Sequence, residues 1–169
     1  LFLGDENRRR KMLELCTEFF ISWTNTLKNA GASFVVIPSM FCTPYVLTRH
    51  LAESVARPAL EYAFSQSSVP LVLHHGSSEF LPFLDLLADL PNVVGVVVDP
   101  RDDLTQCRAV VGPEKILMAG PDGPTLGRSR PDMIQKKCRA ILANRSDDRR
   151  FVLVTTAADV ELTTPVENI

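Results

Sequence analysis

The sequence predicts an α/β protein in which five parallel strands alternate with helices. Five short apolar runs, several rich in β-branched residues, recur along the chain, and segments with apolar residues at helical spacing separate them. Strands that are apolar on both faces are typical of a parallel sheet whose two sides are covered. The pattern is compatible with an open, doubly wound sheet. It is also compatible with an incomplete (β/α)8 TIM barrel, because a complete barrel needs about 250 residues and the chain has 169.

The composition is that of a single globular domain covering residues 1–169. Hydrophobic residues make up 46% of the chain, which is enough for a substantial core. The formal net charge of −2 gives no electrostatic basis for binding nucleic acid or an anionic membrane. No apolar run approaches the ~20 residues of a membrane span, and no signal peptide is visible. The four cysteines are scattered without a close pair, so we expect a cytoplasmic protein with reduced thiols.

The strands and helices can be assigned from periodicity and from breaking residues. Gly31 is a plausible end for the first helix, Pro58 is expected to kink or divide the second, and Ser78 is a candidate cap for the third. A Gly/Pro-rich loop is expected over residues 120–127. The predicted strands are residues 34–37, 69–74, 93–98, 115–119 and 151–155, and the predicted helices are residues 12–27, 45–66, 80–90, 103–111 and 131–143.

The stretch PLVLHHG, residues 70–76, is the most informative part of the chain. It is predicted to be a buried strand whose carboxyl end carries His74 and His75. Binding and catalytic groups collect at this end of the strands in repeating strand–helix proteins. Because successive side chains of a strand point to opposite sides, we expect at most one of the two imidazoles to face a barrel interior. That imidazole either contacts a ligand or is a structural histidine, and the other is expected to pack or to face solvent.

Aspartates follow the next two predicted strands. Asp99 is expected to cap the following helix or to orient a substrate group, the cap being favoured. Asp102 and Asp103 are expected to start that helix. Asp122 lies in a Gly/Pro turn, where an aspartate forms hydrogen bonds with its own backbone, and it is also a candidate substrate contact.

Six segments, taken in order, carry a resemblance to a known family. They are NAGASFVVIPS (29–39), LAESVARPALEYAF (51–64), PLVLHHG (70–76), VVGVVVDPRDDL (93–104), ILMAGPDGPTL (116–126) and TTPVENI (163–169). Together they resemble the uroporphyrinogen decarboxylase superfamily, which also includes the methylcobamide:thiol methyltransferases. The resemblance implies a (β/α)8 barrel of which this chain would cover roughly the fourth through eighth strands.

The resemblance also implies that something completes the barrel. An open barrel exposes strand edges, which normally have to be paired or covered. We therefore expect an amino-terminal half elsewhere in a longer protein, or a partner chain such as a second copy in a homo-oligomer. The chain begins with Leu1 rather than methionine, and we accordingly expect a fragment or a processed product.

The thiol methyltransferases of this superfamily hold zinc with a His-x-Cys pair and a later cysteine, and the metal keeps the bound thiol ionised. By resemblance, His74 occupies the histidine position, whereas the two cysteine positions are Gly76 and Ala158. We therefore expect no zinc, with His74 as the surviving ligand or polar contact and Asp99 beside it at the catalytic position. His75 and Asp122 are the expected substrate contacts. Methylcobalamin is the implied methyl donor, and a corrinoid protein is the implied partner.

Three functions remain open on these grounds. The first is a methyltransferase-like protein of corrinoid-linked one-carbon metabolism whose zinc–thiolate site is degenerate. The second is a non-catalytic binding or scaffold domain that keeps the barrel segment without its chemistry. The third is tetrapyrrole decarboxylation. That branch usually carries histidine where this chain has Ala158, and the family's G-N-x-D-P turn appears here as GPDGP, residues 120–124.

Overall fold

The computed structural model describes residues 4–156 and 160–169, and it contains one five-stranded sheet. The strand order β1-β2-β3-β4-β5 follows the chain, and every neighbouring pair is parallel. A doubly wound sheet reverses its strand order near the middle, whereas a barrel winds in one direction only. The observed order therefore identifies a partial barrel and confirms the five predicted strands. The strands are β1 (Val35–Pro38), β2 (Leu71–His74), β3 (Val93–Val97), β4 (Ile116–Ala119) and β5 (Phe151–Leu153).

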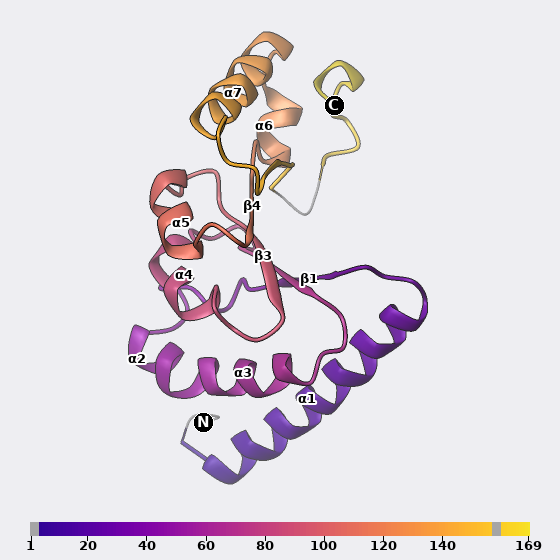
Figure 1. Cartoon of the computed structure of the whole chain (residues 1–169), viewed down its shortest axis with the longest axis vertical. Helices are drawn as coiled ribbons and strands as arrows, with labels where there is room; N and C mark the ends of the chain where they lie inside the picture. Colours follow the sequence, from indigo (N-terminus) through magenta and orange to yellow (C-terminus); the bar gives the residue numbers. More distant parts are fainter. Residues whose placement is uncertain (1–3, 157–159) are drawn as a thin grey trace.

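Helices connect the strands, and the strand–helix units follow one another along the molecule from the indigo to the yellow end (Figure 1). None of the helices in the described residues combines the length and the apolar character that crossing a membrane requires. The helices are α1 (Glu6–Asn29), α2 (Arg49–Leu51), the π-helix η1 (Ala52–Ala56), α3 (Arg57–Ser65), α4 (Leu81–Leu87), α5 (Leu104–Val111), α6 (Gly123–Arg128), α7 (Pro131–Asn144) and the 3-10 helix η2 (Val166–Asn168).

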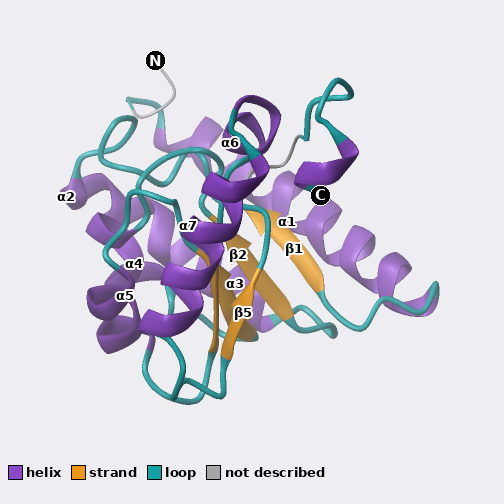
Figure 2. Ribbon diagram, turned by 90° about the horizontal axis from the view of Figure 1, so that it is seen from above, coloured by secondary structure: helices purple, strands orange, loops and turns teal. Residues whose placement is uncertain are grey.

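The strand register separates the side chains of the sheet into two faces. One face packs into the core with helix residues such as Phe64 and Leu84, and it contributes Val35, Leu71, Leu73, Val96, Leu117 and Ala119. The opposite face is the interior of the partial barrel. At its carboxyl end the register aligns Pro38, His74, Val97, Met118 and Val152 in one row. This register places His74 on the interior face. Figure 2 shows the sheet and the helices around it.

Two helix predictions need correction. The helix predicted over residues 45–66 begins at Arg49. The irregularity expected at Pro58 is present, because the π-helix η1 ends at Ala56 and α3 begins at Arg57 with the proline in its first turn. The loop predicted over residues 120–127 contains helix α6. Asp122 caps this helix by accepting a hydrogen bond from Thr125 N at 2.6 Å. Gly123 and Pro124, which the sequence suggested as loop residues, form the first turn of the helix.

The cap of α4 comes from another part of the chain. Its N-cap residue is Phe80, and Ser78 does not cap the helix. Instead the Asp102 carboxylate accepts hydrogen bonds from Phe80 N, at 3.0 and 3.2 Å, and from Leu81 N at 3.1 Å. It also accepts one from Asp99 N at 3.0 Å. Only Asp103 starts the next helix, as predicted, by accepting hydrogen bonds from two backbone N–H groups of α5.

We predict that Asp102→Ala lowers the free energy of unfolding by about 2 kcal/mol, because it leaves three backbone N–H groups of two different loops without an acceptor. The matched control is Asp103→Ala, which removes an exposed local cap worth about 1 kcal/mol. Urea denaturation of both variants at neutral pH measures the difference. A smaller loss for Asp102→Ala than for Asp103→Ala would contradict this assignment.

Candidate functional site

A buried polar bridge crosses the carboxyl end of the sheet. His75 follows β2, Asp99 follows β3 and Thr156 follows β5. The His75 side chain is 2% exposed; its Nε2 lies 2.7 Å from Thr156 O, and its Nδ1 lies 3.1 Å from Asp99 Oδ2. Because β2 and β5 are not neighbours in the sheet, this imidazole connects strand ends across the mouth of the barrel. The structure thus brings together two of the predicted site residues, His75 and Asp99.

The partners of His75 fix the proton on one ring nitrogen. Thr156 O is a carbonyl and can only accept, so Nε2 carries a proton and donates it. Nδ1 lies between Ser77 N, at 3.0 Å, and Asp99 Oδ2, at 3.1 Å; it accepts from Ser77 N when it is unprotonated and donates to Asp99 when it is protonated. With both ring nitrogens engaged and the ring buried, His75 has the contacts of a positioning residue rather than of a group open to a ligand.

Asp99 is held by Arg101 rather than used as a helix cap. Arg101 Nε donates to Asp99 Oδ1 at 2.6 Å, Arg101 Nη2 donates to Oδ2 at 3.0 Å, and the backbone N of Arg101 donates to Oδ1 at 3.0 Å. Burial on its own raises the pKa of the Asp99 carboxyl. The hydrogen bonds from Arg101, together with the nearby His75, outweigh burial and leave that pKa below its ordinary value. The expectation that Asp99 caps the next helix was wrong, since Asp103 does so.

His74 and His75 lie on the same side of the chain. Their rings stack with centroids 4.6 Å apart and an interplanar angle of 18°, which corrects the expectation that they point to opposite sides. Strand alternation ends here because Gly76 and Ser77 both have a positive φ, of 65° and 70°. Gly76 N donates to His74 Nδ1 at 3.0 Å, so each imidazole is held by the N–H two residues further on. Burial, and then the neighbouring His75, lower the pKa of His74.

The turn at Gly76 leaves no room for a side chain. A Cβ at this position would lie 2.5 Å from the Cβ of Met40 in the loop after β1, and the φ of +65° is itself unfavourable for other residues. This is the position that the resemblance gives to a zinc-binding cysteine. The other such position, Ala158, lies outside the described residues. Within residues 4–156 and 160–169, no three histidine, cysteine, aspartate or glutamate side chains are grouped so as to hold a metal ion.

Polar residues that the sequence interpretation missed form the rim of the site. Tyr45 donates from its hydroxyl to Glu79 Oε2 at 2.6 Å, and this hydrogen bond is the main reason that the pKa of Tyr45 is raised. Arg101 Nη2 donates to Ser77 O at 3.3 Å. The Asp-x-Arg spacing of Asp99 and Arg101 is the one local signal that was present in the sequence. Tyr45 and Glu79 are joined only by the fold.

Asp122 follows β4 at the same end of the sheet as the histidines, but its carboxylate caps α6, as expected for a turn-forming aspartate. Burial acts to raise its pKa, but the hydrogen bonds from Thr125 and the charge of Lys137 outweigh burial and lower it. No hydrogen bond joins Asp122 to the histidines in the described structure, and its role as a substrate contact stays a prediction.

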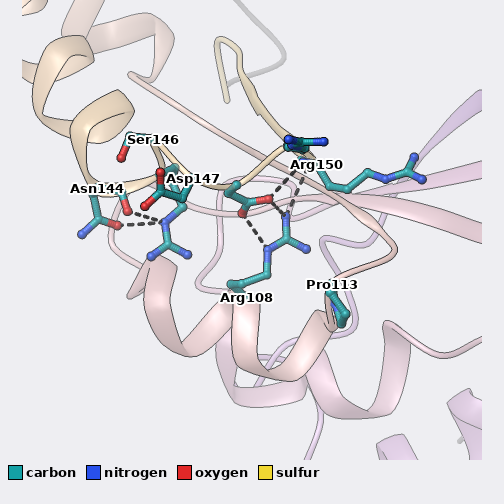
Figure 3. A pocket seen from close by; sticks show the side chains of 9 residues that line it. Arg108, Pro113, Asn144, Ser146, Asp147 and Arg150 are labelled. Atoms are coloured by element: carbon teal, nitrogen blue, oxygen red, sulfur yellow. Dashed lines mark hydrogen bonds and ion pairs between the residues drawn. The ribbon is translucent and has the colours of Figure 1, made fainter.

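A pocket of about 530 Å³ lies at the opposite end of the sheet, beside the amino ends of β4 and β5. Figure 3 shows that its central interaction is a two-armed ion pair, in which Arg108 Nε and Nη2 donate to Asp148 at 2.7 and 3.1 Å. Arg108 Nη1 also donates to the carbonyls of Gly112 and Lys115. These contacts join the end of α5 to the start of β4 and β5, so we interpret Arg108 as a structural clamp.

The lowered pKa of Asp99 predicts a definite pH dependence. A carboxyl whose pKa is lower in the folded state stabilises the fold above its unfolded pKa of about 3.9, and this contribution is lost as the pH falls. We expect Asp99→Asn to lower the free energy of unfolding at pH 7 by roughly 1.5–3 kcal/mol. The difference from wild type should shrink below about pH 4 in pH-dependent urea denaturation.

The control for this prediction is Asp132→Asn, which breaks the exposed ion pair between Arg130 and Asp132. Its effect at pH 7 should stay within about 1 kcal/mol. If the stability difference between Asp99→Asn and wild type were the same at pH 7 and at pH 3, the ionised bridge would not be the source of the stabilisation.

Comparison with known proteins is informative at two levels. No curated protein matches the chain. Among solved structures, a methyltransferase from Methanosarcina mazei superposes with a TM-score of 0.85 at 22% sequence identity, and the match covers 99% of this chain and 48% of that one. The chain therefore spans about half the length of this relative and shares its fold.

A match to a protein family extends over the whole chain. The family is described as Uroporphyrinogen decarboxylase (URO-D), and it matches residues 1–169. The five sequential parallel strands agree with a segment of a barrel of this fold. The chain belongs to the uroporphyrinogen decarboxylase family.

Proposed function

We propose that this chain is a methyltransferase-like member of its family, in which His74 is the polar group that meets the substrate. The observation that supports this is the half-buried imidazole on the interior face at the carboxyl end of β2. The ring is held by Gly76 N, and its stacking partner His75 is fixed in turn by Asp99 and Thr156. Ligand-contacting groups of barrel enzymes lie at this end of the strands.

The protonation of His74 determines what it can do. Nδ1 accepts from Gly76 N, so the neutral ring carries its proton on Nε2 and acts as a hydrogen-bond donor. Its lowered pKa favours this neutral form at pH 7. Such a group is suited to orient a carbonyl or an anionic group of a methyl acceptor. The methyl donor in this proposal is methylcobalamin, carried by a separate corrinoid protein as a substrate.

We propose further that zinc-dependent thiol activation is lost. A histidine that binds a metal through Nε2 donates its other N–H to an acceptor, whereas Nδ1 of His74 faces an N–H donor. The position of the expected cysteine ligand has a backbone that excludes a side chain. Among the residues that the structure describes, the donor set at the mouth therefore does not fit a zinc ion, and in this proposal the reaction uses another way of activating its acceptor.

A non-catalytic scaffold is the second candidate, and one observation favours it. The hydrogen-bonding groups of His75 and Asp99 are taken up by other protein groups, as in a purely structural network. Tetrapyrrole decarboxylation is the activity in the family's description. The activity test described below therefore also measures whether the protein consumes uroporphyrinogen.

We predict that His74→Ala lowers the rate of methyl transfer by about 10²-fold or more, the usual contribution of a positioned proton donor. Transfer from methylcobalamin to a panel of thiols and tetrahydrofolate, measured in the full-length protein, tests this. His50→Ala is the matched control, because His50 lies in the exposed part of α2 and should leave the rate unchanged. Complete inertness of the wild type would support the scaffold instead.

For the metal, we expect zinc to bind the wild type more weakly than micromolar in a calorimetric titration, and Gly76→Cys not to tighten it. A Gly76→Ala variant should be less stable than wild type by more than the ~1–2 kcal/mol cost of a left-handed residue. Gly31→Ala separates the two causes, since Gly31 has a φ of +98° with no atom near its missing Cβ. Submicromolar zinc binding by Gly76→Cys would refute the proposed exclusion.

A further inference from the structure

The pocket beside the amino ends of β4 and β5 has an excess of positive charge. Four arginines and two aspartates line it, and most of them belong to the loop between α7 and β5. One of the aspartates, Asp148, is neutralised by its two-armed ion pair with Arg108 (Figure 3). Asp147 is the one other lining carboxylate in the described structure. Three arginines remain to face it, namely Arg145, Arg149 and Arg150.

These three arginines have N–H donors that the protein does not use within residues 4–156 and 160–169. Arg145 Nε donates to Asn144, and its Nη2 reaches Thr105 Oγ1 at 3.4 Å, which leaves Nη1 without a protein acceptor. Arg150 joins the network only through its backbone, whose O accepts from Arg108 Nη2 at 3.2 Å. The side chains of Arg149 and Arg150 are exposed. Guanidinium donors are therefore available to a ligand in the pocket.

The helix that precedes the loop does not account for this charge. A cation is stabilised by the dipole of a helix only near its last turn. Helix α7 ends at Asn144, with Arg145 as its C-cap residue, so Arg149 and Arg150 lie beyond that turn. The same bias extends over residues 128–150, which contain eight lysines and arginines against three aspartates, whereas the whole chain has 18 basic and 20 acidic residues. Positive charge is thus concentrated on α7 and its following loop, where it attracts anions.

We propose that this pocket binds a phosphorylated small molecule, whose phosphoryl oxygens accept hydrogen bonds from Arg145, Arg149 and Arg150. The planar fork of a guanidinium matches the geometry of phosphate oxygens, and hydrogen bonds between two charged groups are the strong ones. The volume of about 530 Å³ lies within the range of pockets that hold small ligands.

The base of the proposed site is rigid before any ligand arrives. Arg108 donates to Asp148 and to the carbonyls of Gly112 and Lys115, so it holds the two loops around the pocket together. The site lies at the opposite end of the sheet from His74. Its occupation is therefore independent of the proposed methyl transfer, and each proposal can fail without the other.

Calorimetric titration of the full-length protein with inorganic pyrophosphate and, separately, with ADP tests the site. Both titrations are done without divalent cations at about 50 mM NaCl, where screening is weak. We expect pyrophosphate to bind with a Kd below about 1 mM. The double variant Arg149→Gln/Arg150→Gln should weaken this binding about ten-fold or more. Tighter binding of ADP would identify a nucleotide as the ligand, whereas equal or weaker binding would identify the phosphate groups alone as what the pocket recognises.

The matched control is Lys136→Gln/Arg139→Gln, which removes the same charge from exposed positions of α7 that do not line the pocket. Its Kd for pyrophosphate should stay within about two-fold of wild type. Asp147→Asn removes the unpaired carboxylate from the pocket and should tighten binding about three-fold. This gain keeps the test decisive even if a double variant fails to fold.

Three results would overturn the proposal. The first is that neither ligand binds the wild type at millimolar concentration. The second is that the two double variants weaken binding equally, which would show that the ligands follow the overall charge of the protein and not the pocket. The third is that Asp147→Asn leaves the affinity unchanged.

Discussion

The arrangement at the mouth of this partial barrel depends on one buried imidazole. His75 lies between the Asp99 carboxylate and the Thr156 carbonyl, and so it connects the ends of β2, β3 and β5. Buried polar groups are costly when unpaired, so a network in which each member is satisfied fixes its geometry strongly. Arg101 completes the network from the solvent side by holding both oxygens of Asp99. Displacing any member would leave another without its partner.

His74, the residue proposed to meet substrate, takes its orientation from this network. Its ring stacks on His75 and accepts a hydrogen bond from Gly76 N, and both contacts require the left-handed turn at Gly76 and Ser77. The same turn brings the backbone against Met40 and excludes a side chain from position 76. The lack of room for a side chain at position 76 and the stacking of the two histidines thus both follow from one backbone conformation. A methyltransferase of this form would therefore activate its acceptor without a zinc thiolate.

Local patterns in the sequence predicted the regular elements well and their junctions poorly. The five strands were evident because their apolar, β-branched runs carry the signal of a buried parallel strand. Helix α6 was missed because glycine and proline are usually loop signals, although they also fit the first turn after the Asp122 cap. The two histidines were expected on opposite sides because alternation holds only while a strand continues, and β2 ends at His74.

By itself the sequence determined the fold class, the family and the missing cysteine at position 76, since each of these is contained in short ordered segments. Only the tertiary structure decided which residues meet. His75 and Thr156 are 81 positions apart, and Asp102 caps a helix that begins about twenty residues earlier. Such contacts depend on how the strand ends converge around the barrel axis. The residues between the partners can form the same helices and strands whether or not the contact exists. The local sequence pattern therefore does not predict which distant residues come into contact.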